Sequence, residues 1–310
     1  MLAALIALVA LACSPSAATP AAETTPTAPA GATPVPTATI IVQELQVLQL
    51  VVAVTDLAVG PGNRLAFALI GSDGPVRVPT AAVQLVFLGG GGGQGSQVAA
   101  VFRPWPVEPG GIYSALINFE RAGLWGIEAR VFLPGGGTGV GRAQLSVATA
   151  SSAPSLGTRP PASRNKTSAD FTDPSDPEEL ATITSSSEPD PDLYRLTVAE
   201  ALDSGRPTVV SFATPAYCRT ATCGPQVEVI TALKDSFADR ANFIHIEVYE
   251  APHQLADLSR ARLVPQMAEW GLLSEPFTFV LDRDGRVAAK FEGFVNEDEL
   301  GAALSAVLDS

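Results

Sequence analysis

Two cysteines five residues apart form the part of this sequence with the clearest chemistry. Cys218 and Cys223 lie in a loop between the apolar run Thr208–Ala213 and a helical segment that opens with Cys-Gly-Pro. The thiolate is the reactive form of cysteine, and a helix N-terminus favours it. On one continuous helix, residues five apart are too distant for a bridge, but a loop cysteine and one at the helix start can bring their Cα atoms within ~6 Å. The spacing therefore predicts a disulfide or a redox couple.

The sequence around these cysteines predicts alternating strands and helices. A short helix is indicated at Thr197–Leu202, because Thr197 is followed three residues later by Glu200, as in a capping box. The turn at 282–285 ends in Asp-Gly and predicts a hairpin. The other expected elements are strands at Thr208–Ala213 and Ala241–Tyr249, helices at 224–240 and 296–308, a helical region at 255–270 interrupted near Pro265, and hairpin strands at Phe277–Leu281 and Arg286–Phe291.

Three segments between residues 193 and 310 carry a resemblance to a known family. Val209-Val-Ser-Phe-Ala213 resembles the central strand of thioredoxins, and Cys223-Gly-Pro resembles the opening of their Cys-Gly-Pro-Cys motif. The segment Trp270–Gly285 resembles their stretch with a cis-proline before a hairpin. The resemblance implies a thioredoxin-like α/β fold in which Pro276 follows a cis peptide bond, faces the cysteines and shapes a substrate groove.

The active-site segment departs from that family pattern. Four residues separate the two cysteines, where the family has two, and Tyr217 stands where the family has tryptophan. The family's buried acid falls on Ser211, whereas Glu275 directly precedes Pro276. A carboxylate close to the thiols would raise their pKa. The resemblance places Pro276, Tyr217 and Glu275 along the substrate groove.

Thiol–disulfide exchange, without a dissociable cofactor, is the activity that the resemblance implies. One thiolate would attack a substrate disulfide, and the second cysteine would resolve the mixed disulfide. Distance from the preceding strand favours Cys218 as the nucleophile, whereas the Cys-Gly-Pro match favours Cys223. Two alternatives stay open: a non-catalytic binding or scaffold protein with a structural disulfide, and a copper carrier of the cytochrome-oxidase assembly type that uses both cysteines and His253. His245 lies in an apolar strand and is expected in the core.

An all-β pattern precedes this region, at residues 40–150. Short apolar runs separated by Gly- and Pro-rich turns are typical of an immunoglobulin-like sandwich. The expected strands are Gln46–Val54, Arg64–Ile70, Ala81–Leu88, Gln97–Phe102, Ile112–Phe119, Leu124–Leu133 and Gly141–Val147. Alternation points Tyr113, Phe119 and Trp125 toward the core, and Trp105 is expected to fold over it. The predicted fold class is an N-terminal immunoglobulin-like β-sandwich plus a C-terminal α/β thioredoxin-like fold at 193–310, joined by a Pro-, Ser- and Asp-rich linker at 151–192.

The first residues predict export and anchoring. Leu2–Ala12 is entirely apolar, too short to span a bilayer but suited to a secretory signal, and Cys13 follows it. Small residues before a cysteine resemble the bacterial lipoprotein signal, which implies a signal at 1–13 and lipid attachment to Cys13. Residues 14–39 are rich in Ser, Ala, Thr and Pro and predict a disordered tether. We therefore expect a lipid-anchored protein on the outer face of the cytoplasmic membrane, in the cell envelope.

Charge narrows the classes of partner. The 310 residues include 32 acidic and 19 basic side chains, which gives a formal net charge of −13. A surface of this sign repels nucleic acid. The expected partners are protein thiols or disulfides outside the cytoplasm, together with the membrane that holds the lipid.

Overall fold

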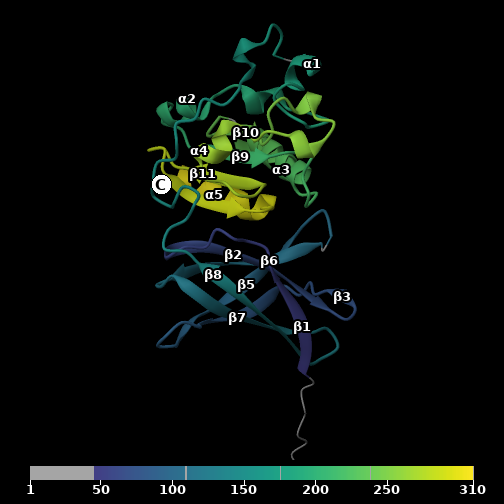
Figure 1. The fold of residues 1–310 in the computed structure, drawn as a ribbon, viewed down its shortest axis with the longest axis vertical. Helices are drawn as coiled ribbons and strands as arrows, with labels where there is room; N and C mark the ends of the chain where they lie inside the picture. The colour runs from purple at the N-terminus through teal and green to yellow at the C-terminus, as the bar shows by residue number, and fades with distance from the viewer. Residues whose placement is uncertain (1–44, 109, 175, 238, 310) are drawn as a thin grey trace, which may run out of the picture. The chain divides into compact units, whose positions relative to one another are not determined.

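The computed structural model describes residues 45–309, except residues 109, 175 and 238 (Figure 1). The predicted signal at 1–13, the lipid site at Cys13 and the tether at 14–39 lie outside the described residues. The described residues belong to one compact unit. Within the described part of the chain, no helix combines the length and apolarity needed to cross a bilayer.

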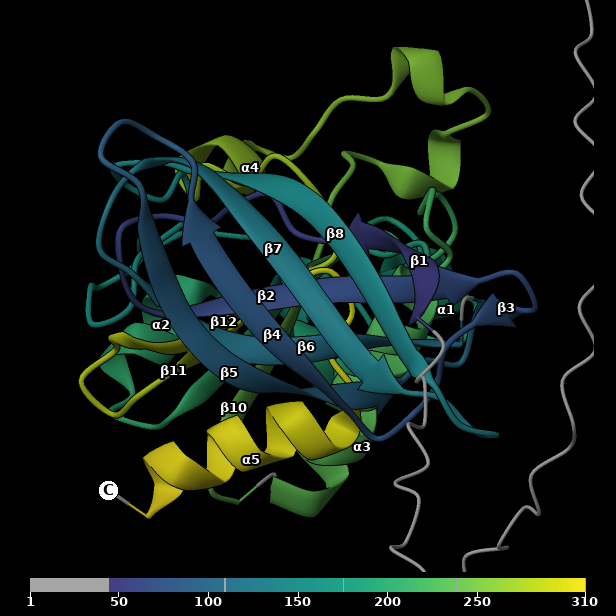
Figure 2. The ribbon, with the colours of Figure 1, turned by 90° about the horizontal axis from the view of Figure 1, so that it is seen from below.

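The described residues between 45 and 147 form eight strands of one sheet. They are β1 (Leu45–Val52), β2 (Gly60–Gly71), β3 (Gly74–Pro75), β4 (Thr80–Phe87), β5 (Gly93–Pro104), β6 (Gly111–Phe119), β7 (Gly123–Phe132) and β8 (Thr138–Val147). Their order is β1-β8-β7-β4-β5-β6-β2-β3, and a further pairing of β1 with β2 closes seven of them into a barrel. Figure 2 shows β4, β7 and β8 running side by side across this sheet.

The predicted immunoglobulin-like sandwich is wrong, because β1 joins both ends of the sheet. It pairs antiparallel with β2, where Gln49 lies opposite Ile70, and parallel with β8, where Leu45 lies opposite Thr138. A sandwich keeps two separate sheets, whereas a barrel is a single sheet closed on itself. Both architectures bury alternate residues of each strand, so apolar alternation along the sequence does not distinguish them.

Aromatic side chains fill the barrel core. Tyr113, Phe119 and Trp125 are buried there, which confirms their predicted orientation. Trp105 packs over the same core, as predicted, and its ring centroid lies 5.7 Å from that of Phe294, beyond the last strand of the chain. The indole of Trp105 therefore touches both the barrel and the C-terminal region.

A separate four-stranded sheet follows. Its strands are β9 (Thr208–Ala213), β10 (Asn242–Glu247), β11 (Phe277–Leu281) and β12 (Val287–Glu292), in the order β10-β9-β11-β12. Strands β9 and β10 are parallel, while β11 is antiparallel to both β9 and β12. Every residue of β9, β10 and β11 is buried, which requires cover on both faces of the sheet.

Helices cover the two faces of this sheet. The elements are α2 (Val198–Asp203), α3 (Cys223–Phe237), α4 (Pro265–Glu269) and α5 (Glu297–Leu308). Ile230 of α3 and Leu304 of α5 pack with Val209 on one face, and Figure 2 shows these two helices side by side. Ala201 of α2 packs in the cluster of the other face, which includes Trp270 directly after α4.

The predicted α/β thioredoxin-like fold is also corrected by the structure. The second sheet is small and has few helices, and the chain as a whole is dominated by the closed barrel. Residues 255–270, predicted to be helical with an interruption near Pro265, contain two short helices, the three-residue η4 (Leu258–Arg260) and the five-residue α4. Pro265 is the physical reason, since proline fits the first turn of a helix but interrupts its interior.

The segment between the barrel and the second sheet carries short helices. These are η1 (Ser168–Asp170), α1 (Pro177–Leu180) and η2 (Pro191–Tyr194). Leu180, Ile183 and Tyr194 are buried in the same cluster as α3. This part of the predicted linker at 151–192 therefore packs against the second sheet.

A buried ion pair connects the barrel to α5. Arg64 of β2 donates to both carboxylate oxygens of Glu299, at 2.9 and 2.8 Å. Arg64 also donates to the carbonyl oxygens of Glu292 and Phe294, each at 3.3 Å. Burial raises the pKa of the Glu299 carboxyl, but the hydrogen bond and charge of Arg64 outweigh it and hold the pKa below its usual value.

Candidate functional site

Cys218 and Cys223 form a disulfide, as their spacing predicts, with a Cα–Cα distance of 5.8 Å. Cys218 lies in the loop after β9, and Cys223 is the first residue of α3. Strand β9 pairs with β10 and β11, so the loop that carries Cys218 begins at the centre of the second sheet. The predicted arrangement of one cysteine in the loop and one at the helix start is confirmed.

The two sulfur atoms differ in access. Cys223 is fully buried in the cluster under α3, whereas Cys218 is half-buried and its loop neighbours Arg219 and Thr220 are exposed. A thiolate that attacks a disulfide must approach the sulfur along the S–S axis, so the more accessible sulfur is the one attacked. This difference in access distinguishes the two cysteines, which sequence alone left open.

Hydroxyl groups line the loop next to Cys218. The Oγ1 of Thr220 lies 3.2 Å from Cys218 Sγ and 2.8 Å from the Oγ1 of the buried Thr222. Between these two threonines, Ala221 adopts a left-handed backbone with φ 56°. Such a conformation is uncommon for a residue with a side chain.

A groove opens beside the disulfide. It has a volume of about 660 Å³ and runs between the 185–188 segment and the exposed side of α3. Pro215 and Ala216 line it from the loop before Cys218, and Gly224 lines it next to Cys223. The residues that line the groove include neighbours of each cysteine in the sequence but neither cysteine itself.

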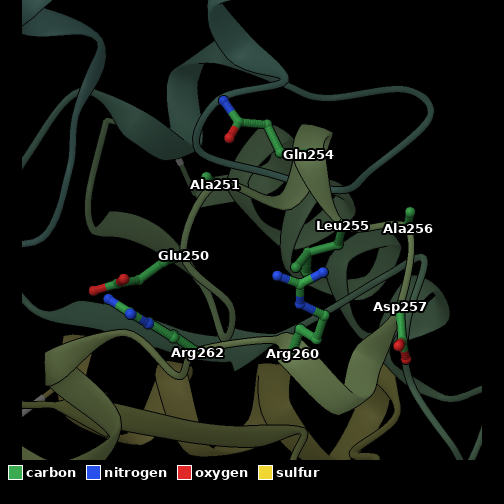
Figure 3. Close-up of a pocket in the computed structure, with 8 residues that line it drawn as sticks. All are labelled: Glu250, Ala251, Gln254, Leu255, Ala256, Asp257, Arg260 and Arg262. Carbon is green, nitrogen blue, oxygen red and sulfur yellow. The ribbon is translucent and has the colours of Figure 1, made fainter.

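Tyr217 connects the cysteine loop to residues 250–262, which lie between β10 and α4. Its hydroxyl donates to the carbonyl oxygens of Pro252 at 2.8 Å and Leu255 at 3.3 Å. Residues 250–262 line an open pocket of about 340 Å³, into which Arg260 extends in Figure 3. The predicted groove residue Tyr217 is therefore a link between two loops.

The peptide bond between Glu275 and Pro276 is cis, as the sequence predicts. Pro276 is buried, and its carbonyl oxygen accepts the amide of Gly293 at 2.9 Å. Burial raises the pKa of the Glu275 carboxyl; the positive charge of Arg219 opposes this rise and the negative charge of Glu247 adds to it. Glu275 is therefore close enough to feel the charge of the residue next to Cys218, while the role of Pro276 in a substrate groove stays a prediction.

His245 is a core residue, as predicted, and lies beside the strand that leads to the cysteines. Its Nε2 is 3.1 Å from the carbonyl oxygen of Ala213, and its Nδ1 is 2.8 Å from the Tyr194 hydroxyl. The carbonyl can only accept, so Nε2 carries the proton and Nδ1 accepts from Tyr194. Burial lowers the pKa of the imidazole, although the charge of Glu247 opposes this shift.

Sequence reasoning missed two polar residues behind the loop, Glu247 and Ser185. Glu247 is the last residue of β10, and its carboxylate accepts the hydroxyl of Ser185 at 2.6 Å. The same hydroxyl accepts the backbone amide of Ala216, two residues before Cys218, at 3.1 Å. The acidic end of an otherwise apolar strand, Phe-Ile-His-Ile-Glu247, is the sequence signal that could have revealed this contact.

His253, the third residue of the copper alternative, is exposed, and its Nε2 lies 2.9 Å from the side-chain nitrogen of Gln254. Among the residues that the structure describes, no group of three or more His, Cys, Asp and Glu side chains is arranged to hold a metal ion. Copper binding by Cys218, Cys223 and His253 stays a prediction.

Comparison with known proteins gives weak likenesses. No family model and no curated protein matches the chain. A thiol:disulfide interchange protein of the thioredoxin family from Chlorobium tepidum TLS is 16% identical, with a TM-score of 0.30, over 36% of this chain and 86% of that one. The PKD domain of the human VPS10 domain-containing receptor SorCS2 is 17% identical, with a TM-score of 0.20, over 41% of this chain and 96% of that one. A superoxide reductase (neelaredoxin) from Ignicoccus hospitalis is 12% identical, with a TM-score of 0.19, over 32% of this chain and 80% of that one.

Proposed function

We propose that this protein performs thiol–disulfide exchange with partner proteins through Cys218 and Cys223. The observation that carries the proposal is the unequal burial of the pair: a half-buried cysteine in a loop is bonded to a fully buried cysteine at the N-terminus of α3. A partner thiolate can reach Cys218. Cys223 is held in the core, where it can act as the leaving thiolate and later re-form the bond. The groove beside the pair gives a partner chain room to approach.

The exchange takes two steps, written here for the oxidised pair. A partner thiolate attacks Cys218 Sγ, a mixed disulfide forms, and the bond to Cys223 breaks so that Cys223 leaves as a thiolate. A second partner thiol loses its proton and attacks the partner sulfur of the mixed disulfide, which releases the Cys218 thiolate. The partner then holds a disulfide, two electrons have moved to the cysteine pair, and both thiolates can take up protons from water.

Local structure favours the thiolates that these steps require. Cys223 opens the fifteen-residue α3, whose N-terminal backbone amides and dipole stabilise negative charge. The Thr220 hydroxyl, 3.2 Å from Cys218 Sγ, can donate a hydrogen bond to a thiolate there. In the reverse direction, the more accessible Cys218 is the nucleophile and the buried Cys223 is the resolving cysteine.

Trapping of a mixed disulfide tests this assignment. The Cys223→Ser variant keeps the accessible Cys218 without a resolving partner. It should accumulate a mixed disulfide with a peptide whose single cysteine carries an aromatic thiol in disulfide linkage, because the Cys218 thiolate attacks the peptide sulfur and the aromatic thiolate leaves. The matched Cys218→Ser variant retains the buried Cys223 and should react at least tenfold more slowly. Mass spectrometry of the intact protein measures both adducts.

The reduction potential decides between exchange and a purely structural bond. Equilibration of the wild-type protein with dithiothreitol should give a potential above about −300 mV, in the range of exchanging pairs. A lower value, together with equal and negligible trapping in both cysteine variants, would contradict the proposal and favour a binding or scaffold protein with a bracing disulfide.

We also propose that the exchange takes place outside the cytoplasm, on a protein anchored through Cys13. The support is the apolar run before Cys13 and the Thr- and Pro-rich segment after it, both of which lie outside the described residues. An oxidising compartment suits a disulfide in the resting protein. Radiolabelled palmitate should be incorporated by bacteria expressing the full chain and lost in the Cys13→Ser variant; equal labelling would contradict the anchor.

A further inference from the structure

One serine connects the backbone before Cys218 to a buried carboxylate on the neighbouring strand. The Ser185 hydroxyl donates to Glu247 Oε2 at 2.6 Å and accepts the amide of Ala216 at 3.1 Å. A hydroxyl can donate one hydrogen bond while accepting another, so both contacts form at once. Ser185 therefore bridges the cysteine loop and the end of β10.

The bridge is anchored at its far end by the way Glu247 is held. Glu247 is only 4% exposed, and its second oxygen accepts the amides of Val248 and Tyr249 at 3.0 and 3.4 Å. The amide of Ser185 donates to Oε2 at 2.8 Å, so Oε2 accepts both the amide and the hydroxyl of Ser185. Removing hydrogen-bond donors from a buried carboxylate costs much free energy. The hydrogen bonds between Ser185 and Glu247 therefore resist displacement.

The bridge limits the freedom of the loop when the disulfide is open. Reduction frees the loop between β9 and α3, and Cys218 can then move away from Cys223, which stays fixed in the core. A hydrogen bond that holds Ala216 in place keeps Cys218 close to Cys223 and raises the effective concentration of one thiol at the other. The closed disulfide and the Ser185 bridge therefore stabilise each other, and this coupling is reciprocal.

We infer that Ser185, backed by Glu247, is a positioning residue that makes the Cys218–Cys223 disulfide easier to re-form after reduction. Its kinetic consequence, a faster resolving step, rests on the proposed function. Its equilibrium consequence does not, because any reducible disulfide has a measurable equilibrium with a small dithiol. Neither side chain touches a reacting atom; both act through the backbone of the loop.

The test compares Ser185→Ala with Ser185→Thr and with the exposed neighbour Ser187→Ala. Each variant is equilibrated with dithiothreitol, and the oxidised fraction is measured by thiol labelling. Loss of the bridge should lower the equilibrium constant for disulfide formation threefold to tenfold in Ser185→Ala, equivalent to about 15 to 30 mV. Ser185→Thr keeps a hydroxyl, so its equilibrium constant should lie closer to that of the wild type. The equilibrium constant of Ser187→Ala should equal that of the wild type.

A second variant, Glu247→Gln, tests the far end of the bridge. It keeps the side-chain volume but replaces one accepting oxygen by a donating amide, so it should shift the equilibrium in the same direction. Urea unfolding of each oxidised variant establishes that it is folded under the assay conditions.

The outcomes separate this inference from the proposed function. Identical equilibrium constants for wild type, Ser185→Ala and Ser187→Ala would overturn the inference, whatever the trapping experiment gives. A shift in Ser185→Ala that the threonine variant restores would support it, even if the wild-type potential proved too low for exchange with partner proteins.

Discussion

Reduction of the Cys218–Cys223 bond should lower the free energy of unfolding by only about 2 kcal/mol. The bond joins residues with a sequence separation of 5. In the chain-entropy account, a cross-link stabilises by restricting the unfolded chain, and a loop this short gives about 2 kcal/mol. Folding and reduction form a closed thermodynamic cycle. The free energy of reduction therefore differs by the same amount, about 2 kcal/mol, between the folded protein and the unfolded chain. For a two-electron couple this is about 45 mV, which leaves the folded pair readily reducible.

Urea unfolding with and without dithiothreitol measures this difference. The midpoint should fall on reduction while the slope stays nearly constant, since the folded structure is retained. The double variant Cys218→Ala/Cys223→Ala is the control, because its unfolding should not respond to dithiothreitol. A loss above about 4 kcal/mol, or unfolding on reduction alone, would refute the reasoning, because the bond would then be a structural brace rather than one that opens in a folded protein.

Two further predictions concern buried charge. Burial holds the pKa of His245 below its unfolded value of about 6.5, so the unfolded chain binds the proton first as pH falls. The free energy of unfolding should therefore decrease from pH 7.5 to 5.5, and His245→Gln should weaken this dependence whereas the exposed His253→Gln should not; equal slopes in urea titrations would contradict the assignment. Arg64→Ala leaves the buried Glu299 with only the Ser114 hydroxyl at 3.0 Å and Arg103 at 4.0 Å, and should lower the free energy of unfolding by about 3 kcal/mol. The exposed Arg142→Ala should lower it by at most about 1 kcal/mol, and similar urea midpoints for both variants would show that the buried pair adds little.

Local signals in the sequence predicted local structure well. Thr197 and Glu200 form the expected capping box of α2, and Asn296 caps α5 with its side chain on the amide of Glu299. These contacts span three residues, so their pattern is complete within one short window of sequence. The disulfide was predictable for the same reason, because its feasibility depends on a five-residue spacing and a strand-loop-helix boundary.

Long-range pairing was the part that the sequence did not reveal. The closure of the barrel depends on β1 meeting both β2 and β8, and an isolated apolar strand carries no mark of its neighbours. The bridge from Ser185 to Ala216 was missed for a similar reason, since 31 positions separate the two residues and serine is common in the segment around 185. The difference in burial between Cys218 and Cys223 also follows from tertiary packing, which spacing alone does not define.

The pairing of β1 has a consequence for self-association. A strand at the margin of an open sheet offers unpaired amides and carbonyls to any extended chain, and this is a common origin of fibril growth. In the described barrel, β1 pairs with β8 on one side and with β2 on the other, so its amides and carbonyls are not free to pair with another molecule. Strand addition at β1 would first require β1 to detach from β2 or β8, whereas β10 and β12 stay at the margins of the second sheet.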